Sequence, residues 1–152
     1  DWGFDNPAER ATWDQSDVNQ VYHDYFDLLR QSAKSGMFNI IAHADLVKKF
    51  GHRATVDMTD EIQKNAEVFK AAGVAVEINT SGLRKQAKEI YPALSHLKIY
   101  AAAGIPLTFG SDSHDPLDVG KDFDKAFLLA KEAGYREYVL FKNRKIERTI
   151  KL

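Results

Sequence analysis

Two side chains that could do chemistry stand one residue apart in the stretch GSDSHDP, which covers residues 110–116. Asp112 and His114 follow the apolar run of residues 105–109, where a strand is expected to give way to a loop. A carboxylate and an imidazole at this spacing suit the binding of a divalent metal ion or the transfer of a proton. A polar turn that closes a strand would use the same residue types, because Asp and Ser side chains stabilise turns. Both interpretations are open on this stretch alone.

Polar residues also gather at the ends of two earlier strand-like runs. They are His43 and Asp45 after residues 38–42, and Glu77, Asn79, Ser81 and Arg84 in and after residues 74–79. Ligands bind at the carboxyl ends of the strands in parallel α/β folds, so this coincidence favours one shared site. Imidazole and carboxylate ligands suit Zn²⁺, Mn²⁺ or Fe²⁺ better than Ca²⁺. The alternative is the acid–base half of a hydrolase triad, but the chain has no cysteine and no G-x-S-x-G elbow to supply the nucleophile.

Three basic residues and one acidic residue near these ends each have two interpretations. Arg84 is either a solvated charge or an anion clamp, because a guanidinium binds phosphate with two parallel hydrogen bonds. Lys48 and Lys49 could add positive charge, although a solvated face is the favoured interpretation. Glu77 and Asn79 are two positions apart and therefore point to the same face of their strand. Glu77 is either an inward residue that needs a partner or a support for a ligand.

The elements that position these residues repeat four times along the chain. Apolar residues at helical spacing predict helices at 18–35, 59–72, 94–103 and 123–133, which are followed by β-rich runs at 38–42, 74–79, 107–109 and 138–141. Alternation at about 30 residues per unit is typical of βα units with parallel strands. The sequence therefore predicts an α/β fold, with residues 1–152 as a single domain. The first fifteen residues contain two Trp and a Phe, which predicts a loop packed onto this domain.

Composition narrows the class of protein. With 152 residues, 44% of them hydrophobic and 28% charged, the chain has the composition of a soluble globular domain. The formal net charge of −1 offers no surface for nucleic acid or for an anionic membrane. No apolar run reaches the roughly 18 residues of a membrane-spanning helix. The absence of cysteine fits a cytoplasmic location, which we expect for this protein.

Three segments in this order resemble the PHP (polymerase and histidinol phosphatase) family: NIIAHADLVKKFG, VAVEINTSGLRK and GIPLTFGSDSHDPLDVG. The opening DWGFDNP is similar to the segment that follows a metal-binding His in the histidinol-phosphate phosphatase branch. The resemblance implies a distorted barrel of seven βα units, with up to three divalent metal ions at the carboxyl ends of its strands. It also implies that the four units of this chain form the C-terminal part of that barrel.

The resemblance assigns roles to residues at the strand ends. His43, Asp112 and His114 match ligands of three different metal ions, which would be Zn, Mn or Fe, and Asp112 and His114 are also the catalytic candidates. Arg84 and Ser81, in the SGLRK stretch, match a region that contacts the substrate. The implied activity is that of a metal-dependent phosphomonoesterase in histidine biosynthesis, whose small substrate is histidinol phosphate and in which a metal-activated hydroxide attacks phosphorus. The general acid is open, with His52 and Asp115 as candidates.

The chain departs from the family pattern at its start. None of its five histidines forms the H-x-H of the first family motif, and the bridging Glu is missing. His23 and His96 fall within predicted helices, where we expect structural roles on the outer layer. We therefore expect a C-terminal portion that binds metal weakly, and whose open sheet edges require either an N-terminal part or self-association. Two alternatives are a non-catalytic half-barrel that self-associates and another PHP activity, such as a phosphoesterase or exonuclease.

Overall fold

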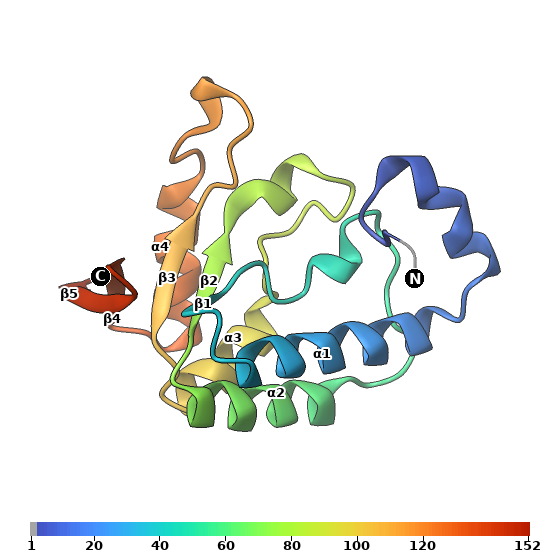
Figure 1. The fold of residues 1–152 in the computed structure, drawn as a ribbon. Helices are drawn as coiled ribbons and strands as arrows, with labels where there is room; N and C mark the ends of the chain where they lie inside the picture. Colours follow the sequence, from blue (N-terminus) through green and yellow to red (C-terminus); the bar gives the residue numbers. More distant parts are fainter. Residues whose placement is uncertain (1–2) are drawn as a thin grey trace.

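A computed structural model describes residues 3–152, and its helices and strands alternate along the chain (Figure 1). The α-helices are α1 (Val18–Lys34), α2 (Thr59–Ala72), α3 (Leu94–Ala102) and α4 (Phe123–Ala133). The strands are β1 (Ile40–Ile41), β2 (Ala75–Asn79), β3 (Leu107–Gly110), β4 (Glu137–Lys142) and β5 (Lys145–Lys151). Four 3-10 helices complete the order: η1 (Pro7–Gln15), η2 (Leu46–Lys48), η3 (Thr80–Arg84) and η4 (Pro116–Asp118). The predicted helices are thus confirmed, with small shifts at their ends.

The first three strands form a parallel sheet in the order β1-β2-β3, as the repeating pattern predicts. Ile40 pairs with Ala75, and Val76 pairs with Leu107. The strand ends that carry polar residues therefore lie at one end of the sheet, from which η3 and the loop of residues 111–122 continue (Figure 1). The α/β class and the parallel arrangement of these three strands are confirmed.

The helices cover the face of the sheet opposite to Glu77. Val76 and Ile78 alternate with Glu77 along β2, and they are fully buried together with Phe69 of α2 and Leu97 of α3. Burial of side chains of this size contributes about 1.5–3 kcal/mol each. Glycine ends α2 in the expected way, because Gly73 has a φ of 67° and so adopts the left-handed conformation that closes helices.

The prediction of a fourth parallel strand is wrong. β4 pairs antiparallel with β5 and forms a separate two-stranded sheet, while Tyr138 of β4 contacts Phe109 of β3 through its ring. The turn at Asn143 and Arg144, which have φ angles of 50° and 64°, gives β4 this antiparallel partner. Two consecutive residues in the left-handed region make the tight turn of a hairpin, so one edge of β4 is paired with β5, and no ladder joins its other edge to β3. Three parallel strands do not close a barrel, and the seven-unit barrel stays a prediction.

The N-terminal segment is packed down as expected, but it is a 3-10 helix and not a loop. Asn6 caps η1 by accepting a hydrogen bond from the Ala8 backbone, and Pro7 is favoured at the first helical position. Trp13 is buried, and its indole Nε1 donates to the Phe4 carbonyl at 2.9 Å. The residues Asp1 and Trp2 of the DWGFDNP segment lie outside the described part of the chain.

Candidate functional site

The two strand ends that carry the predicted metal ligands share an unusual backbone conformation. His43, directly after β1, has a φ of 34°, and Asp112, after β3, has a φ of 47°. Residues other than glycine uncommonly adopt a positive φ, and they keep this conformation where the surrounding contacts hold it. Hydrogen bonds from neighbouring elements hold His43 and Asp112 in this conformation.

Glu77 links the end of β1 to the centre of the sheet. Its Oε2 accepts hydrogen bonds from the His43 backbone N–H at 3.1 Å and from Asn79 Nδ2 at 2.9 Å. This contact confirms that Glu77 and Asn79 point to the same face of β2. On the other side, a Cβ at Gly110 would lie 1.9 Å from Glu77 Oε1, so a larger residue at this position of β3 would require the carboxylate to move. Glu77 thus lies below the strand ends and supports the backbone of His43.

The imidazole of His43 is poised to accept a ligand. Its Nδ1 is buried and has no hydrogen-bond partner among residues 3–152. The backbone carbonyl of the same residue accepts a hydrogen bond from the Tyr25 hydroxyl at 2.9 Å, which fixes the residue without occupying the ring. A buried polar atom without a partner is costly, and a metal ion is one of the groups that would satisfy it. The donor chemistry of His43 therefore fits the metal role that the resemblance implies.

Asp45, two residues further on, is engaged through one carboxylate oxygen, while its Oδ1 is buried without a hydrogen-bond partner among residues 3–152. It is 1% exposed, and its Oδ2 lies 2.7 Å from Lys48 Nζ and 3.4 Å from His96 Nδ1. Burial alone would raise the pKa of Asp45, but the positive charge of Lys48 and the contact with His96 outweigh burial and lower this pKa. Oδ2 also accepts a hydrogen bond from the Ala93 backbone at 2.8 Å. Asp45 therefore fixes the start of α3 to the segment after β1.

Two predictions for residues around Asp45 are wrong in part. Lys48 is 3% exposed and forms a second ion pair with Glu89 at 2.9 Å, so it does not lie on a solvated face. His96 is structural, as predicted, but it faces the buried Asp45 and not the outer layer. His23 does lie on the outside of α1, where it is 45% exposed and 3.6 Å from Glu61. A lysine near a strand end cannot be recognised as buried from its own position, because its partners are distant in the sequence.

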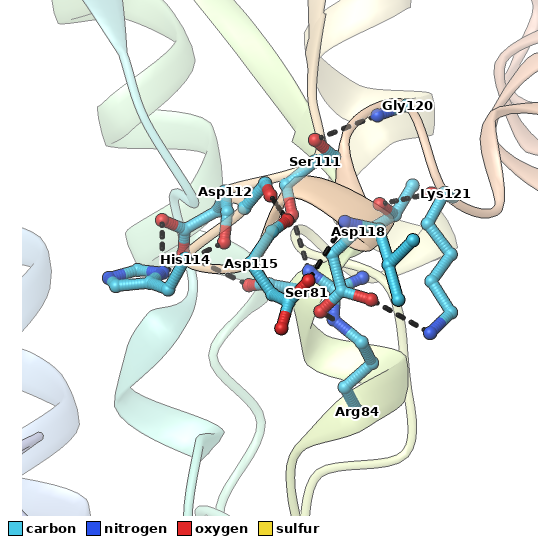
Figure 2. A network of polar contacts seen from close by, with 12 residues as sticks. Ser81, Arg84, Ser111, Asp112, His114, Asp115, Asp118, Gly120 and Lys121 are labelled. Carbon is cyan, nitrogen blue, oxygen red and sulfur yellow. Dashed lines mark hydrogen bonds and ion pairs between the residues drawn. The ribbon is translucent and has the colours of Figure 1, made fainter.

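Asp112 and His114 are close to each other, as their spacing requires (Figure 2). Ser81 Oγ donates a hydrogen bond to Asp112 Oδ2 at 3.1 Å, which brings the end of β2 and the end of β3 together. His114 Nδ1 lies 3.1 Å from the Asp112 carbonyl and 3.9 Å from Asp112 Oδ1. The His114 side chain is 85% exposed, so its ring has room for a ligand.

Arg84 points at the same loop, and it contacts the loop on two sides (Figure 2). Its Nη2 donates to the Ser111 carbonyl at 2.6 Å, and its Nε lies 3.2 Å from Asp118 Oδ2. The third nitrogen, Nη1, is buried and has no partner among residues 3–152. In this arrangement the guanidinium joins η3 to the loop, and the contact of Arg84 with substrate stays a prediction. Asp118 was not singled out from the sequence, because only the folded loop brings it to Arg84.

The two candidates for the general acid have other partners here. The His52 ring stacks on Trp13, with ring centroids 4.4 Å apart and an angle of 8° between the planes. Asp115 Oδ1 accepts a hydrogen bond from the Leu117 backbone at 2.8 Å and so caps η4. Neither contact selects one of them as an acid.

The described residues do not bring a complete metal site together. Among residues 3–152, no three His, Asp or Glu side chains are placed so that they could hold one ion. His43, Asp112 and His114 lie at one end of the sheet, and Asp112 and His114 approach each other to 3.9 Å.

The sequence was compared with protein-family models and with curated proteins. No protein-family model matches the chain. The chain is 40% identical over 147 residues to a "Probable histidinol-phosphatase" of Deinococcus radiodurans, covering 96% of this chain and 55% of that protein. It is 33% identical over 120 residues to the histidinol-phosphatase of Bacillus subtilis, covering 73% of this chain and 44% of that protein.

A solved structure of similar fold carries a related name. It is the "putative histidinol phosphatase hisK" from Listeria monocytogenes, with 26% identity and a TM-score of 0.58 over 66% of this chain and 42% of that chain. The chain spans about half the length of the curated relatives that it matches. No helix among residues 3–152 is both long enough and apolar enough to cross a membrane. The chain is therefore similar, over 66–96% of its length, to one portion of proteins that are named histidinol-phosphatase, which supports the resemblance to that branch of the PHP family.

Proposed function

We propose that the protein is a metal-dependent phosphomonoesterase that hydrolyses histidinol phosphate. The observation that carries this proposal is the 40% identity to a named histidinol-phosphatase over 96% of the chain. The proposal is supported by the position of His43, Asp112 and His114 at the carboxyl ends of parallel strands, where parallel α/β folds bind ligands. The complete protein would be a distorted barrel of seven βα units, of which this chain forms the C-terminal part.

The proposed ligands of the divalent ions are His43, Asp112 and His114, with Zn, Mn or Fe as candidates and up to three ions in the complete site. A bound divalent ion would lower the pKa of a water molecule and neutralise charge on the phosphoryl oxygens. Ser81 keeps the Asp112 carboxylate in place through its hydrogen bond of 3.1 Å. His114, largely exposed beside Asp112, is free to contact the phosphoryl group.

Release of inorganic phosphate from histidinol phosphate tests this proposal. The complete product of the gene that encodes this chain is assayed with and without a chelator, and the chelated enzyme is then supplied with Mn²⁺ or Zn²⁺. We expect turnover that the chelator abolishes and that the added metal restores. The variant Asp112→Asn removes the charge of one proposed ligand and should lower kcat by at least about a hundredfold. Turnover that survives the chelator would exclude the metal mechanism, and phosphate release from unrelated esters alone would point to another PHP activity.

One observation favours a second candidate, the non-catalytic half-barrel. Among residues 3–152, no three metal-binding side chains meet at one point. On this hypothesis the strand-end residues are structural, and self-association covers the edges of the sheet. The two candidates differ in the metal content and the oligomeric state that they predict for the isolated chain.

A further inference from the structure

The 3-10 helix η3 and the loop of residues 111–122 are joined by polar contacts whose donor side chains all come from η3. These side chains make contacts with both ends of the loop and not only with its tip (Figure 2). These contacts are Thr80 Oγ1 to the Lys121 carbonyl at 2.7 Å, Ser81 Oγ to Asp112 Oδ2 at 3.1 Å, Arg84 Nη2 to the Ser111 carbonyl at 2.6 Å, and Arg84 Nε to Asp118 Oδ2 at 3.2 Å. The loop that carries the proposed ligands Asp112 and His114 is therefore fixed mainly from η3.

Arg84 makes the contact that spans the loop. It binds the residue before Asp112 through the Ser111 carbonyl, and it binds the far side of the loop through Asp118. The side chains of Arg84 and Asp118 are only 19% and 23% exposed, so this ion pair is shielded more than a typical surface pair. A lysine would have to make both contacts from one nitrogen, because it lacks the planar fork whose Nη2 and Nε reach the Ser111 carbonyl and Asp118 separately.

The loop needs this support because of the backbone at Asp112. A φ of 47° is uncommon outside glycine, although Asp adopts it more readily than most residues, and neighbouring contacts help to keep it. The neighbouring Ser111 is held twice, through its carbonyl by Arg84 and through its Oγ, which accepts a hydrogen bond from the Gly120 backbone at 3.1 Å. Release of the Ser111 carbonyl would therefore free the backbone of Asp112 and the direction of its carboxylate.

We propose that Arg84 and Asp118 are positioning residues, which hold the loop so that Asp112 and His114 keep the geometry that the reaction needs. The proposal rests on the proposed function for its consequence in catalysis, but the clamp itself is a property of the fold. The proposed role differs from a direct contact between Arg84 and the substrate phosphate. If Arg84 bound the phosphate directly, Asp118 would only orient the Arg84 side chain and would not hold the loop.

Three variants of the complete protein test the proposal in catalysis. Arg84→Lys and Asp118→Asn each disrupt the clamp, and Asp122→Asn is the matched control, because the Asp122 carboxylate on the same stretch pairs with Lys125 of α4 at 2.6 Å. Arg84→Lys and Asp118→Asn should each lower kcat about tenfold, with KM changed less than about twofold. The double variant should lose little more than Arg84→Lys alone, because both changes remove one shared contact. A raised KM at unchanged kcat in Arg84→Lys, with Asp118→Asn like wild type, would show a direct substrate contact and overturn the proposal.

A second measurement does not depend on activity. Amide hydrogen exchange of Gly120, whose N–H donates to Ser111 Oγ, reports on the closure of the loop. Exchange at Gly120 should be about tenfold faster in Arg84→Lys and in Asp118→Asn, and unchanged in Asp122→Asn. Unchanged exchange in the first two variants would exclude the clamp. If the wild-type protein releases no phosphate but the exchange behaves as expected, the proposed function fails and the clamp stands.

Discussion

Glu77 Oε2 accepts the backbone N–H of His43 at 3.1 Å, so the central strand of the sheet supports the residue that ends its neighbour. The other carboxylate oxygen of Glu77 lies so close to Gly110 that a Cβ there would be 1.9 Å away. One side chain therefore sets the spacing between the ends of β1 and β3, which carry the first two proposed ligands.

The variant Gly110→Ala should displace the Glu77 carboxylate, since a methyl group at this position overlaps Oε1. We expect a loss of about 1–3 kcal/mol in the free energy of unfolding, measured by urea denaturation. Glu77→Ala in the same background removes the overlap, so the double variant should be more stable than the sum of the two single changes predicts. Strict additivity of the two changes would contradict the close contact.

The buried pair of Lys48 and Asp45 gives a prediction for stability. Lys48→Met leaves the carboxylate of Asp45 buried without its main partner, and should cost about 3–5 kcal/mol in the free energy of unfolding. The double variant Lys48→Met with Asp45→Asn removes both charges and should recover most of that loss. A double variant that is no more stable than Lys48→Met alone would show that the pair does not act as a unit.

The same carboxylate predicts a dependence of stability on pH. The pKa of Asp45 is lowered in the folded protein, chiefly by the charge of Lys48 against the opposing effect of burial. The stabilisation is therefore fully present above the ordinary pKa of 3.8 and is lost as the pH falls below it, through the lowered value. Urea denaturation of wild type and Asp45→Asn between pH 7 and pH 3, buffered in matched salt, measures this loss. The difference between the two proteins should shrink as the pH falls, and a constant difference would contradict the assignment.

The hairpin turn is tied to the segment before β1 by Arg144. Its guanidinium donates to the carbonyls of Gly36 at 2.8 Å and Met37 at 3.2 Å, and to Asn39 Oδ1 at 3.0 Å. Arg144→Ala should lower the free energy of unfolding by about 1 kcal/mol, since these hydrogen bonds lie at an exposed site. Arg148→Ala on the exposed strand β5 is the control and should change stability by less than about 0.5 kcal/mol. Equal effects of the two changes would mean that the Arg144 contacts do not stabilise the fold.

The parallel part of the fold could be predicted from the sequence, because apolar runs that alternate with helices leave few other arrangements. Because these strands are parallel, His43 and Asp112 were expected at the same end of the sheet. The hairpin was missed because Asn143 and Arg144 adopt positive φ without the glycine that usually marks such a turn. The clamp of Arg84 on Asp118 and the burial of Lys48 could not be predicted, since both depend on partners that only the folded loops bring near.

Metal content and mass of the isolated 152-residue chain give the last prediction. The proposed ligands on this chain are His43, Asp112 and His114. Because no three His, Asp or Glu side chains of residues 3–152 are placed to hold one metal ion, the chain should bind Mn²⁺ or Zn²⁺ weakly. We expect less than one ion per chain by elemental analysis after dialysis, and a further loss in the variant His43→Gln. Light scattering on the same samples gives the oligomeric state. A tightly held ion that survives a chelator would contradict the incomplete site. A stable metal-free oligomer without phosphatase activity would favour the half-barrel, because self-association would then cover the sheet edges that a closed barrel does not have.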